Sequence, residues 1–568
     1  MFETKKTQLF DTPPKKAAKV AKVSIPKNKF AREALRSSLS TTSLGNGALK
    51  MTTTGHSFVD QFGKASAYKA PRTFKEIGDD TNLLFSEDGL TALKFLTYLR
   101  LITRVTQFSD GTKTSTTQRG QGLKHEGVFR MIWLAINRPS TFWKNIVLFI
   151  AAGSWKDVFI MLQYDLVYNG WEGRKLDWDN FGQLILAALE NPSSSNLVKK
   201  YLPQIKANSA CTTVDSQADN MIAKWICSLI FGAKTGSESA KYKSYRKLKT
   251  SGTAHEWQKL ISQKKMLSID FDSIHGRALA QLVSSKFLKN QGLDEKYTKW
   301  IEAKPVAKYT GYVYELFKDV KTSRTKAQLI TVDKQFMQLI EVAKNGMKEG
   351  DNGLLTVVDS SGSMDSPSLG TTMPAYHVAL GMALYFSYLL RGDFSGMWFE
   401  FSHSTVIKHW TGNTPTDKFR NETSRITEDT NFLSVASKLV EMRKNGVPET
   451  DFPNGILCIS DGCFNSAGTN KSNTVQFMDI LKRGGFSKEY TDKFRIILWD
   501  IPNGYYNAKG HQAFENFADT PNLLHMSGLD PAVVAFVTGT EAQAFAPKTS
   551  EEVFEAAMNQ EILEMLTL

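Results

Sequence analysis

Apolar residues recur at helical spacing through the first part of the chain. One stripe at i, i+3, i+4 and i+7 consists of Phe95, Tyr98, Leu99 and Ile102. The same spacing predicts further helices at residues 124–138, 140–151, 155–166, 179–190, 215–232, 254–263, 275–288, 293–302 and 325–346. Because the connections are short, the pattern favours antiparallel helices in a curved, HEAT-like repeat array, although no strict sequence period is present.

From Leu354 onward the pattern changes to strands that alternate with helices. Apolar runs predict strands at 354–358, 396–401, 406–410, 455–461, 494–500 and 522–528. Helical patterns cover 374–390, a segment after Thr430, and residues 474–482, 530–537 and 551–566. No strand run of comparable strength precedes Leu354. The alternation predicts a doubly wound, mainly parallel, Rossmann-like sheet.

These patterns predict an α plus α/β protein with three regions. Residues 1–34 are rich in Lys, Ala and Pro without amphipathic periodicity, and we expect a disordered basic arm there. Residues 35–350 form the helical domain, although residues 35–80 are polar and predict only weak structure. Residues 351–568 form the α/β domain.

The composition is that of an ordinary globular protein, with 41% hydrophobic and 22% charged residues. No apolar signal region follows the basic N-terminus, and the most apolar helical stretch, Ile146 to Ala152, is too short to span a bilayer. The cysteines lack disulfide or zinc spacing and predict reduced thiols in or near the core of a cytoplasmic protein; they are Cys211, Cys227, Cys458 and Cys463.

Charge is distributed unevenly along the chain, whose net value is +13. Residues 351–568 contain 16 Lys and Arg against 26 Asp and Glu, whereas residues 1–350 contain 54 against 31. A basic half of this kind favours a polyanion partner, and nucleic acid is the expected one. The alternatives are that the lysines solubilise a helical surface, or that the two halves attract each other.

Chemistry-bearing residues gather where the first predicted strand of the α/β domain ends. Asp359 follows the apolar run 354–358, and Ser361 and Ser363 stand at alternate positions after it. Ligands of open α/β sheets sit at the carboxyl ends of strands, and oxygen-only donors suit a hard cation such as Mg²⁺. The alternative for this triplet alone is a capped strand-to-helix turn.

The pattern Asp-x-Ser-x-Ser resembles the metal-ion-dependent adhesion site of von Willebrand factor A domains. That family completes the site with a Thr and a second Asp from later loops. The resemblance therefore implies Thr430, in Glu-Asp-Thr-Asn-Phe, and Asp461, at the end of the run 455–461, as further ligands. Thr423 and Thr427 are close enough in sequence to take the place of Thr430.

Three local clusters stand out in the helical half. They are Gln118-Arg-Gly-Gln-Gly-Leu-Lys-His125, Ala152-Gly-Ser-Trp-Lys-Asp-Val158, and a region from Ala223-Lys-Trp225 to Lys241-Tyr-Lys-Ser-Tyr-Arg-Lys-Leu-Lys249. The run 241–249 mixes five cations with two tyrosines, which suits phosphate contact together with base stacking. The alternative is a solvated helix face with Tyr242 and Tyr245 turned into the core.

The order of these clusters resembles the TROVE module of the Ro autoantigen family, especially its bacterial and phage relatives, over roughly residues 85–540. The resemblance implies a ring of helical repeats closed by an A domain, which binds small structured RNAs and single-stranded RNA ends. It implies RNA contacts by Lys124, His125, Arg130, Lys224, Lys241 and Arg246. The chain departs from the family in its Lys-rich arm and in Ser154, where relatives more often have a bulky basic residue.

We therefore expect a non-enzymatic, cytoplasmic RNA-binding protein whose A domain binds Mg²⁺. A protein partner could complete the shell of the ion with a carboxylate, and no membrane association is expected. The alternative is a metal-dependent interaction scaffold that binds no RNA. A metal-dependent hydrolase is disfavoured, because no His or Glu with catalytic spacing accompanies the loop and no nucleophile elbow surrounds Ser361 or Ser363.

Overall fold

The structure, a computed structural model, describes the greater part of the chain. The described residues are 41–43, 49–51, 54, 56–64, 72–101, 104–107, 115–118, 120–252, 256–274, 276–284, 287–305, 307, 309, 312–318, 320–321, 325–346, 352–367, 373–423, 429–462, 464–465, 472–501, 520–527 and 549–568. The predicted arm, residues 1–34, and the predicted helix at 530–537 lie outside them.

The chain divides into two compact units. The first, the helical unit, contains Arg72–Ser268 and Ala557–Leu568. The second, the sheet unit, contains Ile269–Ala556 together with the described residues between Ser24 and Pro71.

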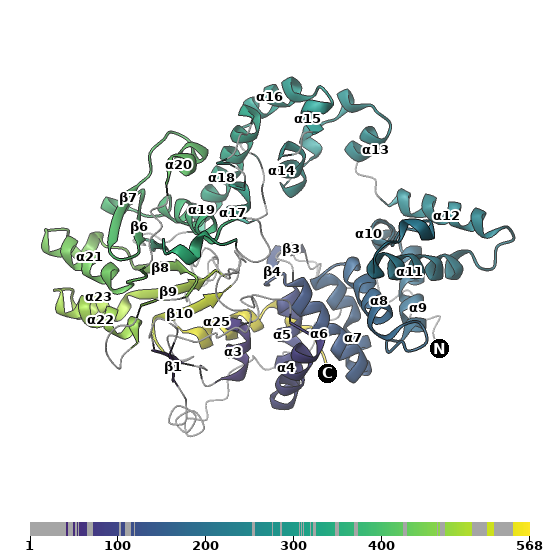
Figure 1. Ribbon diagram of the computed structural model, residues 1–568, viewed down its shortest axis with the longest axis horizontal. Helices are drawn as coiled ribbons and strands as arrows, with labels where there is room; N and C mark the ends of the chain where they lie inside the picture. The colour runs from purple at the N-terminus through teal and green to yellow at the C-terminus, as the bar shows by residue number, and fades with distance from the viewer. Residues whose placement is uncertain are drawn as a thin grey trace. The chain divides into compact units, whose positions relative to one another are not determined.

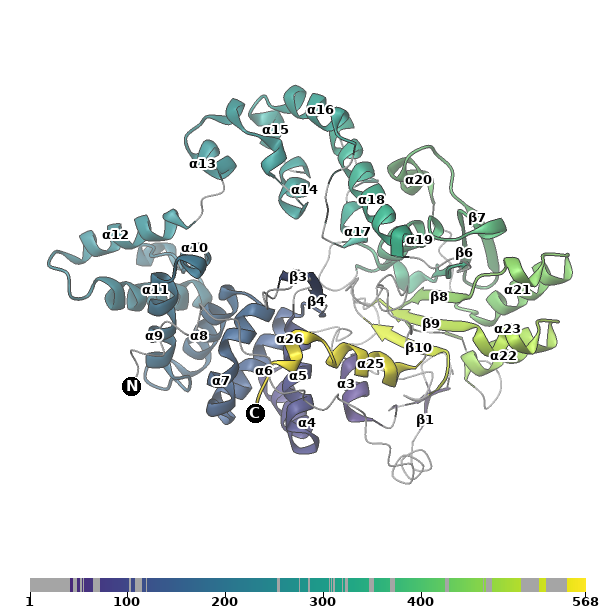
Figure 2. The same cartoon turned by 180° about the vertical axis from the view of Figure 1, so that it is seen from behind.

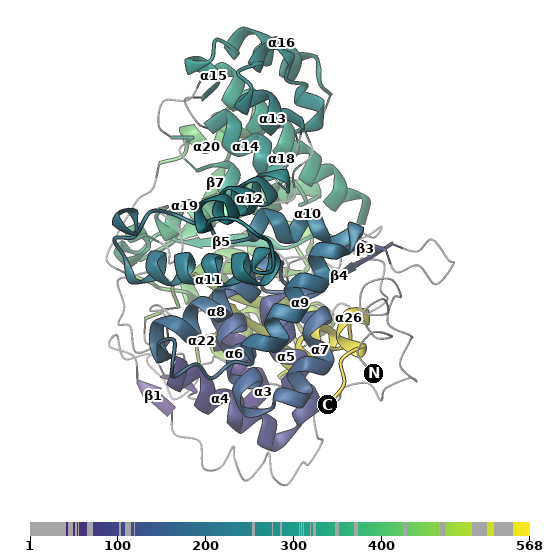
Figure 3. The same ribbon diagram turned by 90° about the vertical axis from the view of Figure 1, so that its right-hand side faces the viewer.

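The helical unit is built of helices that pack on their neighbours in the chain, with α11 and α12 toward the viewer in Figure 3. The helices predicted in this region are confirmed within a few residues at each end, and three further helices, at residues 74–87, 192–201 and 238–251, were not predicted. The helices are α4 (Phe74–Glu87), α5 (Gly89–Arg100), α6 (Lys124–Asn137), α7 (Pro139–Ala152), α8 (Trp155–Asn169), α9 (Trp178–Glu190), α10 (Pro192–Tyr201), α11 (Val214–Phe231), α12 (Glu238–Ser251) and α13 (Glu256–Ser262).

Local sequence sets where these helices begin. Asp88 caps α5 by accepting hydrogen bonds from the N–H groups of Leu90 and Thr91, at 3.0 and 3.1 Å. Pro139 and Pro192 occupy the first positions of α7 and α10, where a missing N–H costs nothing. Gly127 permits close packing of α6 on α5, because a Cβ there would lie 2.5 Å from Cβ of Arg100.

The C-terminus of the chain belongs to the helical unit. The predicted helix at 551–566 is two helices, α25 (Ser550–Met558) and α26 (Glu561–Glu564), and α26 packs on α5. Beyond α26, the N–H of Thr567 donates to Oδ1 of Asn145 at 3.0 Å, and Nζ of Lys144 donates to the carbonyl of Leu568 at 2.8 Å.

The sheet unit contains a six-stranded sheet, of which Figures 1 and 2 label β6 to β10. The strand order is β10-β9-β8-β5-β6-β7. Its strands are β5 (Leu355–Asp359), β6 (Met397–Phe401), β7 (Thr405–His409), β8 (Gly455–Ser460), β9 (Arg495–Asp500) and β10 (Leu523–Ser527). Every pairing is parallel except that of β7 with β6. The chain fills the sheet first on one side of β5 and then on the other, so a topological switch point lies between β5 and β8.

Helices cover both faces of this sheet, as the alternation predicts. Val358 faces a core shared with α17 (Val313–Leu316), α18 (Lys326–Gly346) and α19 (Ala375–Ser387). Leu355 and Val357 face the opposite core, shared with α21 (Leu433–Lys444) and α22 (Asn473–Arg483). β5 is buried on both sides, as expected for a central parallel strand.

The boundary between the compact units lies at Ser268 and Ile269 and does not coincide with the boundary expected at residue 350. The helices that precede the sheet in sequence pack in the same unit as the sheet, because α17 contacts α19 and α18 contacts α20. The remaining helices of this unit are α3 (Ser57–Lys64), α14 (Gly276–Ser284), α15 (Phe287–Asn290), α16 (Asp294–Ala303), α20 (Pro415–Asn421), α23 (Lys488–Lys493) and α25 as far as Ala556.

The expectation of weak structure in residues 35–80 was too coarse, since α3 and the start of α4 fall there. Two short antiparallel pairs also precede Leu354, namely β1 (Thr41–Ser43) with β2 (Leu49–Met51), and β3 (Arg104–Gln107) with β4 (Ser115–Gln118). Their residues are mostly polar and their strands have only three or four residues, so apolar patterning does not mark them.

Cys211 and Cys227 are free and buried, and Cys458 is buried in the core on one face of the sheet, while Cys463 lies outside the described residues. Among the helices described, none combines the length and the apolar character needed to cross a membrane.

Candidate metal centre and nucleic-acid surface

Asp359 and Asp461 lie at the ends of two neighbouring parallel strands. β5 and β8 pair with Val358 opposite Ile459, so Asp359 ends its strand beside Ser460, the residue before Asp461. This is the carboxyl edge of the sheet at its switch point, where ligands of doubly wound folds bind. The two carboxylates that the sequence predicts for a metal site are therefore brought to the same edge.

Short hydrogen bonds hold the carboxylate of Asp359. The hydroxyl of Ser460 donates to Oδ2 at 2.6 Å, and the N–H of Ser361 donates to Oδ1 at 2.8 Å. The hydroxyl oxygens of Ser361 and Ser363 lie 3.1 Å apart. Ser460 was missed by sequence reasoning, because it reads as the last residue of an apolar strand and only strand pairing places it against Asp359.

Thr430 is buried in a loop that is tied to the segment after Asp461. The N–H of Asn465 donates to the carbonyl of Thr430 at 2.9 Å, and Oδ1 of Asn465 accepts from the N–H of Thr430 at 3.3 Å. On its other side this loop is joined to the end of β6, since the N–H of Asn431 donates to the carbonyl of Ser402 at 2.7 Å. Thr423 is exposed, and Thr427 lies outside the described residues.

Electrostatics link the two carboxylates. Burial, together with the charge of Asp461, raises the pKa of Asp359 to about 7, against the hydrogen bonds from Ser460 and Ser361. Asp359 is fully buried and Asp461 is 8% exposed. The strand pairing that puts Asp359 beside Ser460 explains why the charge of Asp461 acts on Asp359.

The donors present fit a hard divalent cation. Two carboxylates and three hydroxyls offer oxygen only, which is the preference of Mg²⁺, and Mg²⁺ commonly takes one or two carboxylates and keeps water in its other positions. Within the described residues no group of three or more His, Cys, Asp or Glu is arranged to hold a metal. The predicted Mg²⁺ site contains two residues of these types, Asp359 and Asp461, and its other ligands are hydroxyls. It is therefore not a site built on three or more His, Cys, Asp or Glu.

The helical unit carries a row of aromatic side chains across three helices, which we call the aromatic row. Phe74 comes from α4, His125 and Phe129 from α6, and Tyr164 and Tyr168 from α8. Successive ring centroids are 4.2 Å apart for His125 and Phe129, 4.8 Å for Phe129 and Tyr164, and 4.2 Å for Tyr164 and Tyr168. Tyr168 is 68% exposed, so the row ends at the surface.

Two lysines accompany the aromatic row. Lys124 begins α6 beside His125, and Lys156 lies in the first turn of α8; both are exposed. The pKa of Lys124 is lowered first by partial burial and then by the charge of Lys156. His125 donates from Nε2 to the carbonyl of Arg72 at 2.8 Å, which fixes its ring against Phe129.

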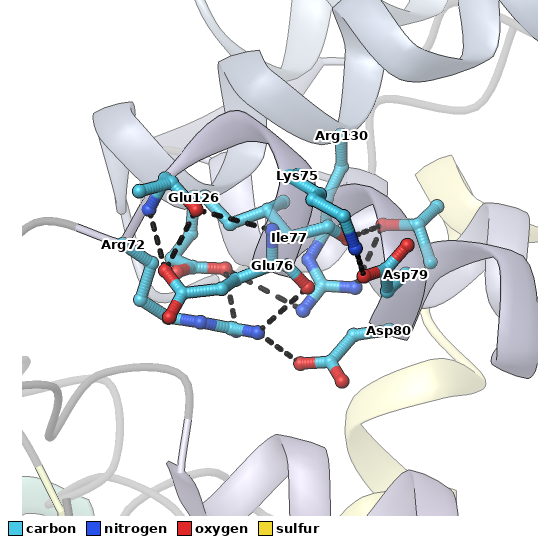
Figure 4. A network of polar contacts seen from close by, with 10 residues as sticks. Arg72, Lys75, Glu76, Ile77, Asp79, Asp80, Glu126 and Arg130 are labelled. Atoms are coloured by element: carbon cyan, nitrogen blue, oxygen red, sulfur yellow. Dashed lines mark hydrogen bonds and ion pairs between the residues drawn. The ribbon is translucent and has the colours of Figure 1, made fainter. Parts of the chain in front are cut away.

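Arg130 is a correction to the predicted RNA contacts. Its side chain is fully buried, its guanidinium pairs with Glu126 at 3.4 Å, and it donates to the hydroxyl of Thr81 at 3.1 Å. Figure 4 shows it inside a network in which Arg72 also bonds Glu126 and Asp80. Burial raises the pKa of Glu126, and the two arginines oppose that rise. Arg130 therefore joins α4 to α6 and has no access to a phosphate.

Three further predicted RNA contacts lie on α11 and α12 and have accessible side chains. Nζ of Lys224 donates to Oδ1 of Asn208 at 3.1 Å, and Nζ of Lys241 donates to the carbonyl of Gly232 at 2.9 Å. Nε of Arg246 donates to the carbonyl of Ile205 at 3.3 Å. Tyr245 is buried, as the alternative interpretation of this run expected, whereas Tyr242 is only half-buried. The nucleic-acid role of these three cations stays a prediction.

Ser154, where the chain departs from the family pattern, begins α8. Its N–H donates to Oδ2 of Asp157 at 2.9 Å, and the carboxylate of Asp157 also pairs with buried Arg100 at 2.9 Å. Gly153 beside it leaves no room for a side chain, since a Cβ there would lie 2.2 Å from Oδ2 of Asp157. The motif Gly-Ser-Trp-Lys-Asp is thus a helix start that is joined to α5 by an ion pair.

Comparison with known proteins gives few matches. A search of curated proteins finds none. Among solved structures, the Ro (RSR) protein of Deinococcus radiodurans is similar at 11% identity and a TM-score of 0.37, over 85% of this chain and 98% of that chain. Residues 354–564 match a family described as a domain of unknown function, DUF7788, from the start of β5 to the end of α26.

Proposed function

We propose that this protein is a non-enzymatic RNA-binding protein of the Ro type. The observation that carries the proposal is the aromatic row with Lys124 and Lys156 beside it. Bases of single-stranded RNA stack on aromatic side chains, while lysines attract the phosphates. A half-buried row that ends in a 68% exposed tyrosine, in a part of the chain rich in cations, has the features of such a surface.

The sheet unit supplies the second part of the proposal, a Mg²⁺ site formed by Asp359, Ser361, Ser363, Thr430 and Asp461. Support comes from the strand pairing that puts both aspartates at one edge and from the hydroxyls beside Asp359. An ion held by only two protein carboxylates stays electrophilic. A carboxylate from a protein partner would then complete its shell, so that the ion recruits the partner.

RNA binding is tested by titrating a labelled single-stranded RNA with the full chain across a range of salt concentrations. We expect saturable binding, with the logarithm of the binding constant falling linearly with the logarithm of salt concentration. Lys156→Gln should reduce that slope by about 0.7, the contribution of one phosphate contact on a single strand. Absence of binding even at low salt would leave the metal-dependent scaffold as the function.

The division of labour between the units is tested by copurification. The RNA that copurifies with the wild type and with Asp359→Ala is sequenced, and the proteins that copurify are identified. Asp393→Ala, which changes an exposed aspartate, is the control. The Asp359 variant should keep its RNA and lose a protein partner. Loss of RNA with every protein retained would show that the roles of the two units are reversed.

A further inference from the structure

A cavity of about 510 Å³ opens at the junction of α11 and α12 in the helical unit. Its lining includes Trp171, Lys224, Trp225, Glu238, Lys241 and Tyr242. This volume lies within the range of small-molecule sites, which is about 300 to 1,000 Å³. The cavity is separate from the aromatic row, since the two share no residue.

The two tryptophans of the cavity are held in place by a third. Trp178 is buried, and it meets the ring of Trp171 at a centroid distance of 5.4 Å and that of Trp225 at 4.8 Å, edge to face in both cases. Its Nε1 donates to Oδ2 of Asp165 at 2.8 Å. Arg174 lies over Trp171, with Cζ 4.0 Å from the ring centroid. Trp171 and Trp225 are half-buried, so they present preorganised apolar surface to the cavity.

Two ammonium groups also reach the cavity. Lys224 and Lys241 each have one hydrogen bond to the protein, from Nζ to Asn208 and Gly232 respectively. An ammonium has three N–H donors, so each lysine retains donors for a ligand. Residues 224–249 contain seven Lys and Arg and one acidic residue, Glu238. The cavity is therefore suited to an anionic group.

The negative charge of Glu238 would repel an anion that has no hydrogen-bond donor. Its position therefore restricts which anionic ligands the cavity can bind. Its carboxylate lines the cavity and accepts a hydrogen bond from the hydroxyl of Tyr242 at 3.3 Å. A carboxylate accepts hydrogen bonds from hydroxyl groups, as acidic residues do from ribose in dinucleotide sites. Aromatic surface, cations and one hydroxyl acceptor together match the three parts of a nucleotide.

We propose that this cavity binds one ribonucleotide, with its base against Trp171 and Trp225, its phosphate near Lys224 and Lys241, and a ribose hydroxyl at Glu238. The nucleotide is either free or the terminal unit of a bound RNA strand. Binding of the terminal unit of an RNA strand rests on the proposed function, whereas binding of a free nucleotide does not. In both cases the cavity adds to the aromatic row a site that recognises one nucleotide.

The test is calorimetric titration of the full chain with adenosine 5′-monophosphate, and with inorganic phosphate as a second probe. We expect saturable binding of the nucleotide and none of phosphate alone. Trp171→Leu and Lys241→Gln should each weaken nucleotide binding at least tenfold. Trp171→Phe keeps an aromatic ring and should keep most of the affinity. Lys247→Gln is the matched control, an exposed cation on the same helix outside the cavity lining, and should leave affinity unchanged.

Absence of nucleotide binding by the wild type, or equal affinity in all variants, would overturn the proposal even if RNA still bound. Competition between the nucleotide and a labelled single-stranded RNA would identify the RNA end as the source. Nucleotide binding without such competition would identify a free nucleotide, and it would stand even if RNA binding failed altogether. The failure of this site and that of the proposed function are thus distinguishable.

Discussion

The hydroxyl of Ser460 donates a 2.6 Å hydrogen bond to Oδ2 of Asp359, across 101 residues of sequence. The same hydroxyl accepts a hydrogen bond from the N–H of Gly462 at 3.0 Å. Ser460 therefore connects the carboxylate at the end of β5 to the loop that carries Asp461. It sets the direction of the Asp359 carboxylate without being one of the proposed metal ligands.

Ser460→Ala should weaken Mg²⁺ binding without abolishing it. Loss of a residue that orients a metal ligand typically lowers affinity about 10- to 100-fold. The measurement is the rise in thermal unfolding temperature with Mg²⁺ concentration, since a ligand at a hundredfold its Kd stabilises by about 2.7 kcal/mol. Asp359→Ala, which removes a ligand, should eliminate the Mg²⁺ response. A Ser460 variant with wild-type response would mean that Asp359 needs no orientation by this hydroxyl.

Tyr168→Ala should weaken single-stranded RNA binding with little effect on folding. Stacking of one base on an aromatic side chain contributes about 1 to 3 kcal/mol, which corresponds to about a 5- to 150-fold loss of affinity. The side chain is 68% exposed, so the free energy of unfolding should change by no more than about 0.5 kcal/mol. Tyr168→Phe keeps the ring and should keep the affinity. RNA binding that is indifferent to both changes would exclude the end of the aromatic row from the interface.

Arg130→Met should destabilise the helical unit and spare RNA binding. The change leaves the buried carboxylate of Glu126 with Arg72 as its remaining cation, at 3.5 Å. Loss of one partner of a buried pair costs about 3 to 5 kcal/mol, and we expect about 2 to 4 because Arg72 remains. Denaturant unfolding measures this cost, and the double variant Arg130→Met/Glu126→Leu should recover part of it. A folded Arg130 variant that loses RNA specifically would restore Arg130 as an RNA contact.

His377 should make the sheet unit less stable as pH falls from about 6.5 toward 4. Burial and the charge of Lys321 lower the pKa of His377 to about 4, against the charge of Asp365. The unfolded chain takes up this proton below about pH 6.5 whereas the folded protein does so only near its lowered pKa, so stability present above pH 6.5 is lost in between. After allowance for solvent screening we expect about 1 to 2 kcal/mol.

The check is denaturant unfolding of the wild type and His377→Gln between pH 4 and 7. Other groups titrate in this range in both proteins, so the informative quantity is the difference between the two pH profiles. The difference should grow as pH falls and level off near pH 4. Parallel profiles would show that folding leaves the pKa of His377 unchanged.

Helix and strand positions followed from sequence because apolar periodicity reports which side of an element is buried. The run 354–358 and Asp359 after it were predicted within one residue, and α6, α8 and α11 nearly as closely. Periodicity does not report what an element is buried against. The approach of Thr81 to Arg130 depends on how α4 packs on α6, whereas Glu126 lies four residues before Arg130 on the same helix. Tyr242 and Tyr245 are three residues apart, yet one lines a cavity and the other is buried in the core.

Sequence by itself determined the helices and strands that have strong apolar periodicity, the uneven charge, and a carboxylate with two hydroxyls at a strand end. Tertiary structure decided which distant residues meet those groups. β5 pairs with β8, which is not its neighbour in sequence, and this pairing alone brings Ser460 and the Asp461 loop to Asp359. The packing of α4, α6 and α8 likewise forms the aromatic row from separate helices. The physical reason is that local patterns encode the burial of one element at a time, whereas a site is formed by contacts between elements.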